Sequence, residues 1–173
     1  MQAITHFFSG IFISILLEPL GTTWLRFLLI TGLCILSHFL IDALAKITYH
    51  PADAKWDDAF WVSWHVIVYI GSVACAIIFI RSYFFGMLVS MIPDIYDWGI
   101  IRGVRAYKRK HNPAVEQDQE KKQFMEGWEF HVLVDKFRER FLSFLPDLNH
   151  EAVGILPEIA IWITCILGVV FIS

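Results

Sequence analysis

Long runs of apolar residues dominate the chain and predict its elements. Five runs approach or reach the roughly 20 residues that an α-helix needs to cross a bilayer, and helix-breaking or polar residues separate them. We therefore predict five transmembrane helices, over residues 4–18, 23–47, 60–80, 83–101 and 153–172. Pro19 and Gly21 end the first, Pro51 follows the second, and Arg81 and Ser82 form a turn between the third and the fourth.

Residues 102–150 have a different character and are predicted to lie in the cytoplasm. They begin with a basic stretch, RGVRAYKRKH, and pass through the charged sequence EQDQEKK. From Phe124 to Leu145 aromatic and charged residues mix, which predicts one amphipathic helix on the membrane surface or against the bundle. The basic cluster predicts that the fourth helix ends in the cytoplasm, which places the N-terminus there too.

Composition supports a membrane protein. Hydrophobic residues make up 57% of the 173 residues and charged residues only 18%, with a mean hydropathy of +0.56, whereas soluble domains carry about 25% charge. The predicted fold class is all-α, a polytopic integral membrane helical bundle forming a single membrane domain over residues 1–173. The N-terminus lacks a basic region and a cleavage site, so we expect a retained first helix. Membrane lipids are expected partners, and nucleic acid is not; the oligomeric state stays open.

Six ionisable residues interrupt, or lie within about a turn of, the apolar runs. Such groups are costly at membrane depth, usually face the bundle interior and often carry function. In the predicted topology all six fall towards the cytoplasmic ends of the first four helices, which predicts one site. Histidine and aspartate are ligands for hard or borderline metal ions. The candidate metal ligands are His6, His38, Asp42, His65, Asp94 and Asp97.

Two pairs have helical spacing. His38 and Asp42 are four residues apart, and Asp94 and Asp97 are three apart just after Pro93, so each pair shares a helix face. Such a pair supplies two ligands, or one ligand and an acceptor that orients it. Pro93 is also expected to kink its helix and free a carbonyl.

Structural alternatives remain open for each candidate. A buried hydrogen bond would explain His38 with Asp42, a single core hydrogen bond would explain His65, and a helix end would explain the Asp94 pair. His131 and Asp135 repeat the H-x3-D spacing in the amphipathic segment, and a solvated polar stripe is the favoured interpretation, with further metal ligands as the alternative. Other ionisable residues are interpreted as solvated or incidental: Glu18, His50, Asp53, Asp57, Asp58, His111 and His150.

Four short motifs resemble a known family. SHFLIDALAKITYHP (residues 37–51) resembles the S-H-x3-D-x-L signature of the predicted membrane-bound metal-dependent hydrolases of bacterial and archaeal inner membranes. MIPDIYDW (91–98) is similar to that family's L-P-D-I-D-H element, ITHFFSG (4–10) to its T-H-x-x-x-G start, and WHVIVYI (64–70) to its T-H-S-L-L helix opening. The order of the two main motifs is reversed here, and H-R-x-x-T-H-S is absent. The resemblance implies that the six candidates bind metal in a bacterial inner membrane.

The expected function is a membrane-embedded hydrolase that uses one or two divalent metal ions, zinc being favoured. A phosphoester of a lipid or lipid-linked substrate at the cytoplasmic interface is the expected target, with Asp42 or Asp97 as general base. Arg102 and Arg105 are expected to steer the head group. The alternatives are an ion- or proton-coupled transporter or channel subunit, in which His and Asp carry the ion, and a non-catalytic membrane adaptor that uses its basic segment.

Overall fold

Every regular element of the described chain is helical, which confirms the all-α prediction. A computed structural model describes residues 2–51, 56–111 and 129–172. A π-helical segment, Ile95–Ile101, joins α4 to α5, and short 3-10 turns occupy Glu18–Leu20, Leu44–Ile47 and Ala152–Gly154. The α-helices are α1 (Ala3–Leu16), α2 (Trp24–Ala43), α3 (Ala59–Ser90), α4 (Ile92–Asp94), α5 (Arg102–His111), α7 (Phe130–Phe141) and α8 (Ile155–Ile172).

The chain forms two compact units. The first joins Met1–Met91 to Leu145–Ser173 and contains α1, α2, α3 and α8. The second is Ile92–Phe144 and contains α4, α5 and α7. The expected cytoplasmic segment therefore contributes α5 and α7, and its residues 112–128 lie outside the described chain.

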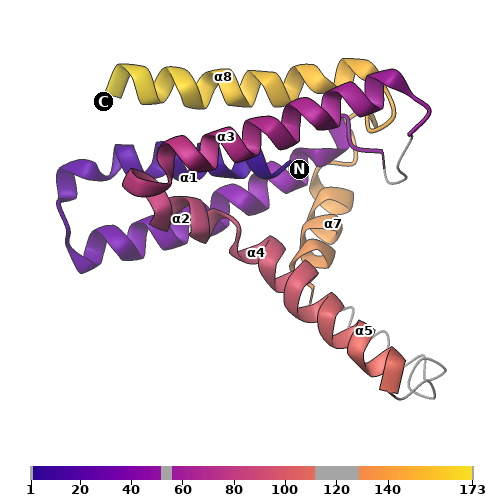
Figure 1. Ribbon diagram of the computed structural model, residues 1–173, viewed down its shortest axis with the longest axis horizontal. Helices are drawn as coiled ribbons and strands as arrows, with labels where there is room; N and C mark the ends of the chain where they lie inside the picture. The colour runs from indigo at the N-terminus through magenta and orange to yellow at the C-terminus, as the bar shows by residue number, and fades with distance from the viewer. Residues whose placement is uncertain (1, 52–55, 112–128, 173) are drawn as a thin grey trace. The chain divides into compact units, whose positions relative to one another are not determined.

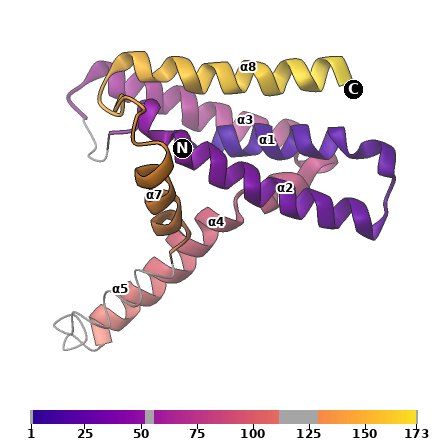
Figure 2. The ribbon, with the colours of Figure 1, turned by 180° about the vertical axis from the view of Figure 1, so that it is seen from behind.

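In the first unit, the short helix α1 packs against α2, α3 and α8 (Figures 1 and 2). Most of its residues are buried, including Ile11 and Ile15, which pack with Cys75 and Met87 of α3. A helix that is apolar all round is enclosed either by other helices or by lipid, and the burial of α1 shows that other helices enclose most of it. The first unit is therefore built around α1.

The two helices that flank α1 begin with conventional side-chain caps. Thr23 accepts a hydrogen bond from the backbone N–H of Arg26 at the start of α2. Asp58 accepts from the N–H groups of Phe60 and Trp61 at the start of α3. Each oxygen satisfies backbone donors that the first helical turn leaves without a partner.

Helix α3 reverses within its length near the predicted turn. Tyr83 has non-helical angles (φ −128°, ψ 21°), two residues after Arg81, and the ribbon turns back there (Figure 1). The returning part brings Gly86 against Gly10 of α1. A Cβ built on Gly86 would lie 2.4 Å from the carbonyl oxygen of Gly10 and 2.1 Å from Oγ of Ser14. Small residues thus let the two backbones approach closely, as in many membrane helix pairs.

The chain just before α8 is fastened to the end of α2. The backbone N–H of Tyr49 donates to the carbonyl of Gly154 at 3.0 Å, and that of His50 donates to Asn149, also at 3.0 Å. The N–H of Leu148 donates to the carbonyl of Lys46 at 2.9 Å. These bonds fix where α8 starts within the first unit.

Three helical stretches are long and apolar enough to cross a membrane: Trp24–Ile47, Ala59–Ser90 and Ala152–Phe171. Large apolar side chains on them are exposed, among them Ile77 (73%) and Phe171 (82%). Continuous exposed apolar surface of this kind is typical of membrane contact. A membrane location is therefore supported by length and composition.

The prediction of five spans is not confirmed. The first predicted span corresponds to α1, which has only 14 residues. The fourth, over 83–101, is interrupted, because α3 ends at Ser90 with Met91 as its C-cap. Pro93 explains the break, since it has no N–H to donate to the carbonyl of Val89.

Candidate metal centre

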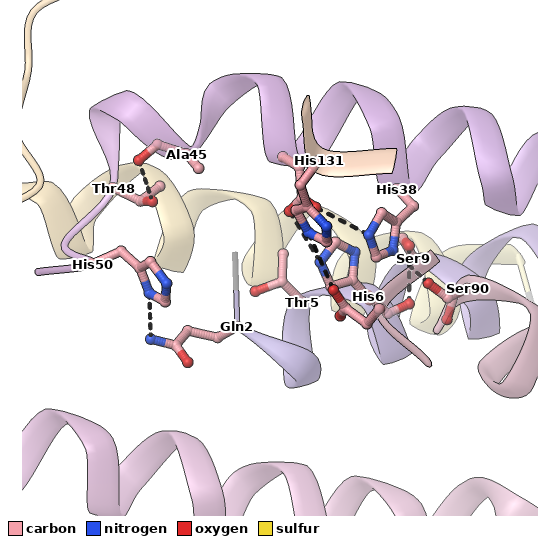
Figure 3. A network of polar contacts seen from close by, with 12 residues as sticks. Gln2, Thr5, His6, Ser9, His38, Ala45, Thr48, His50, Ser90 and His131 are labelled. Atoms are coloured by element: carbon pink, nitrogen blue, oxygen red, sulfur yellow. Dashed lines mark hydrogen bonds and ion pairs between the residues drawn. The ribbon is translucent and has the colours of Figure 1, made fainter. Parts of the chain in front are cut away.

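In the first unit, His38 and Asp42 lie on one face of α2 and are in contact. Nε2 of His38 is 3.0 Å from Oδ2 of Asp42, and both side chains are buried, at 0% and 2% exposure. Nδ1 of His38 is 2.6 Å from the backbone carbonyl oxygen of Ser90 (Figure 3). Because a carbonyl only accepts, Nδ1 carries the proton and donates it, so the neutral ring has its lone pair on Nε2.

The Ser90 carbonyl is available for a reason that lies in the sequence. Ser90 is the last residue of α3, and the last carbonyls of a helix have no partner within the helix. The early end of α3 before Pro93 therefore supplies the acceptor that sets the tautomer of His38. The carbonyl left without a donor by Pro93 itself is that of Val89, so the expectation that Pro93 frees a carbonyl for the site stays a prediction.

His6 of α1 completes a buried group of three, which we call the first-unit cluster: His6, His38 and Asp42. Nε2 of His6 is 3.3 Å from Oδ1 of Asp42, and its ring stacks on that of His38 with centroids 3.9 Å apart (Figure 3). Nδ1 of His6 is fully buried and has no hydrogen-bond partner within the described part of the chain. Buried polar atoms of this kind are uncommon and need an explanation.

The first-unit cluster has donor atoms suited to a divalent metal ion. Each Asp42 oxygen faces one imidazole nitrogen, and neutral Nε2 of His38 has only a lone pair to offer the carboxylate. Two such acceptors repel unless a cation lies between them, either a proton or a metal ion. Ligand atoms at zinc bond lengths in a tetrahedral site are roughly 3.3 Å apart, which is close to the 3.0 and 3.3 Å found here.

His65 lies in the first unit in a different setting. Its Nδ1 donates to the carbonyl of Trp61 at 2.7 Å, and its ring stacks on Trp61 with centroids 4.0 Å apart. It also approaches Tyr69. These contacts match the core-residue alternative, and the role of His65 as a ligand stays a prediction.

The second unit brings three ionisable residues together, which we call the second-unit cluster: Asp94, Asp97 and His131. Nδ1 of His131 is 2.5 Å from Oδ2 of Asp97, and Nε2 is 3.3 Å from Oδ1 of Asp94. Asp97 is buried, whereas His131 is 31% and Asp94 21% exposed. The side chain between the two aspartates comes from α7, more than 30 residues along the chain.

Asp97 also starts helix α7. Its carboxylate accepts the backbone N–H groups of Phe130 at 2.9 Å and His131 at 2.8 Å. The residue before α7, Glu129, makes no side-chain capping bond of its own. A carboxylate from another helix therefore satisfies the free donors at this N-terminus and has a favourable interaction with the helix dipole.

His131 is the residue that the favoured sequence interpretation missed. Its predicted partner Asp135 is 51% exposed and pairs with Arg138 on the same helix, so the solvated stripe applies to Asp135 and is wrong for His131. The available signal was the start of α7, which has no Ser, Thr, Asp or Asn before it and must find an acceptor elsewhere. That signal indicates a tertiary contact without naming Asp97.

The remaining ionisable residues have separate surroundings. Glu18 lies in the exposed turn after α1. His50 accepts a hydrogen bond from the Gln2 amide at 3.3 Å (Figure 3). Asp58 caps α3, Nδ1 of His111 donates to the carbonyl of Tyr107, and Asp53 lies outside the described residues.

No protein-family model, curated protein or solved structure is significantly similar to this chain. The resemblance to the membrane-bound metal-dependent hydrolases therefore stays a prediction from four short motifs. What the chain does show is His and Asp side chains that could hold a metal ion, His38 and Asp42 in the first unit and Asp94 and His131 in the second. They belong to an all-helical protein with three helices long and apolar enough to cross a membrane.

Proposed function

We propose that this chain is an integral membrane protein that binds a divalent metal ion, with zinc favoured, and hydrolyses a phosphoester of a lipid or lipid-linked substrate. The observation that carries metal binding is the pair of contacts made by the His38 ring, with the Ser90 carbonyl on one nitrogen and the Asp42 carboxylate on the other. Its proton is committed to the Ser90 carbonyl, so its lone pair meets the Asp42 carboxylate at 3.0 Å in a buried setting. Donation of the second ring nitrogen to a backbone carbonyl is the usual arrangement of a metal-bound histidine.

The residues have distinct roles in this proposal. Asp42 and His38 hold the ion, and His6 adds a nitrogen ligand from α1. When bound, a divalent ion lowers the pKa of a coordinated water and stabilises negative charge on a phosphoryl oxygen. The Ser90 carbonyl keeps Nε2 of His38 free of a proton for ligation.

The kind of substrate follows from the surroundings of the first-unit cluster. The cluster is held by α1 and α2, in a bundle whose outer side chains are apolar and exposed. A substrate that approaches through the membrane meets such a bundle more readily than a freely soluble one. In the second unit, Arg102 of α5 lies over the Trp98 ring and is suited to an anionic head group.

Metal analysis of the purified full chain tests the proposal. The wild type is compared with His38→Ala, Asp42→Asn and the matched α2 control Leu36→Ala, whose side chain is exposed. We expect about one or more equivalents of metal in the wild type and the control, and at least a tenfold loss in the two cluster variants. Metal-free wild type, or undiminished metal in both variants, would reject metal binding.

Hydrolysis is tested separately on protein with known metal content. We expect phosphate release from a lipid phosphoester in mixed micelles, loss of that activity after chelation, and recovery on adding zinc. A protein that binds metal but shows no activity on lipid phosphoesters would keep the metal site and reject the reaction.

One observation favours a second candidate, an ion- or proton-coupled transporter. Glu158 of α8 is buried, accepts a hydrogen bond from Thr5 at 2.7 Å, and its Oε2 has no hydrogen-bond partner among the described residues. Nε1 of Trp162 donates to the same Thr5 hydroxyl at 2.8 Å. Buried carboxyl groups within spans often belong to ion or proton pathways. Metal uptake into proteoliposomes that Glu158→Gln abolishes would favour transport over hydrolysis.

A further inference from the structure

We infer that His131 and Asp94 are a second pair of metal ligands, and that Asp97 positions His131 without binding the ion. This inference rests on the proposed metal binding and extends it to the second unit. It also changes the role that the sequence suggested for Asp97, which was expected to be a ligand and a candidate general base.

The argument begins with the proton on the His131 ring. Nδ1 is 2.5 Å from Oδ2 of Asp97, and the same carboxylate accepts the backbone N–H of His131 itself. An ionised carboxylate only accepts, so Nδ1 carries the proton and donates it. In the neutral ring the lone pair is then on Nε2, the atom that lies 3.3 Å from Oδ1 of Asp94.

This arrangement has the features of a histidine ligand with its supporting acceptor. Metal-bound histidines usually donate their other ring N–H to a carboxylate or carbonyl, which fixes the ring and raises its basicity. The 3.3 Å between Nε2 and Oδ1 of Asp94 is close to the spacing of two ligands on one zinc ion. Both residues are partly exposed, so an ion has access to them.

Asp97 is already committed to other partners. Its Oδ1 accepts the N–H of Phe130, and its Oδ2 accepts two donors from His131. A metal ion at either oxygen would compete with these bonds and release the start of α7. Asp97 therefore holds the helix and the ring, while Asp94 offers the carboxylate.

Co²⁺ titration of the full metal-free chain in detergent tests the assignment, with visible absorption reporting both affinity and the number of ions. His131→Asn keeps a donor near the Nδ1 position and removes Nε2. We expect His131→Asn and Asp94→Asn each to lose one bound ion or to weaken Co²⁺ binding about 100-fold. Asp97→Asn retains an oxygen acceptor for the His131 ring, so we expect a smaller loss of Co²⁺ affinity. The loss should be about 10-fold, the lower end of the 10- to 100-fold loss of metal affinity that follows when a residue supporting a ligand is changed. Leu133→Ala, an exposed site on α7, is the control.

The outcomes separate this inference from the proposed function. Wild type that binds no Co²⁺ overturns both. Loss of Co²⁺ in His38→Ala with no change in His131→Asn overturns only the second pair. A larger loss in Asp97→Asn than in Asp94→Asn overturns the division of roles and makes Asp97 the ligand. Far-UV circular dichroism checks each variant, and Asp94→Ala, which also removes the carboxylate, replaces Asp94→Asn if that variant does not fold.

Discussion

The two units present the same pair of side chains in two different settings. In each unit, histidine Nδ1 donates to an oxygen acceptor and Nε2 faces an aspartate, at 3.0 Å for His38 with Asp42 and 3.3 Å for His131 with Asp94. The acceptor is the carbonyl of Ser90 in the first unit and the carboxylate of Asp97 in the second. The first pair is fully buried, and the second is partly exposed.

The two pairs also differ in what holds each histidine against its aspartate. His38 and Asp42 share one helix, so their contact follows from a spacing of four residues. His131 and Asp94 come from different helices, and their contact depends on Asp97 at the start of α7. The contact of the first pair is local to α2, and only its acceptor, the Ser90 carbonyl of α3, depends on helix packing. The second pair depends on one capping carboxylate.

The largest expected effect comes from breaking the packing that holds the first unit. Gly86→Leu places a side chain where even a Cβ would lie 2.4 Å from the Gly10 carbonyl, so α1 and α3 must separate. We expect a loss of about 3 kcal/mol or more in the free energy of unfolding, and loss of metal from the first-unit cluster. Thermal unfolding and metal analysis measure the two effects.

The control for this substitution is Gly32→Leu, also within an apolar helix. A Cβ on Gly32 meets nothing within 4 Å, so stability and metal content should stay close to the wild type. Equal destabilisation by both substitutions would contradict the close approach of α1 and α3.

Metal removal is expected to have the next largest effect, and to act through the first-unit cluster. A ligand present at 100 times its dissociation constant stabilises the folded state by about 2.7 kcal/mol. Chelation should therefore lower the unfolding temperature of the wild type, and readdition of zinc should restore it. In Asp42→Asn the shift should be much smaller, and an equal shift in both proteins would remove the first-unit cluster as its source.

The comparison also shows what the sequence can reveal. The apolar runs predicted an all-helical chain, although their division into five spans is not confirmed. The turn predicted at Arg81 and Ser82 lies next to the non-helical Tyr83. The His38 and Asp42 contact was predictable because it is local. The carbonyl next to His38 was predictable in part, because Pro93 indicates a helix break without saying which oxygen meets the ring.

Other features could not be predicted, for physical reasons. An apolar run of 14 residues is consistent with a short transmembrane helix and also with a helix enclosed by other helices. Only the packing of α1 distinguishes the two alternatives. The contact of His131 with Asp97 joins residues 34 positions apart. No helical periodicity links residues at that separation. The four-residue spacing instead suggested Asp135 as the partner of His131.

The smallest expected effect concerns the carboxylate that starts α7. Asp97→Ala removes the acceptor for two backbone N–H groups, those of Phe130 and His131, and loss of a comparable helix cap costs about 1 kcal/mol. We expect amide hydrogen exchange at the start of α7 to speed up about fivefold. Asp135→Ala is the matched control, because its carboxylate pairs with Arg138 on the same helix and accepts none of these backbone bonds. Unchanged exchange at the start of α7 in Asp97→Ala, or an equal effect of Asp135→Ala, would contradict the capping role of Asp97. The contrast between a contact within one helix and a contact held by a cap would then fail.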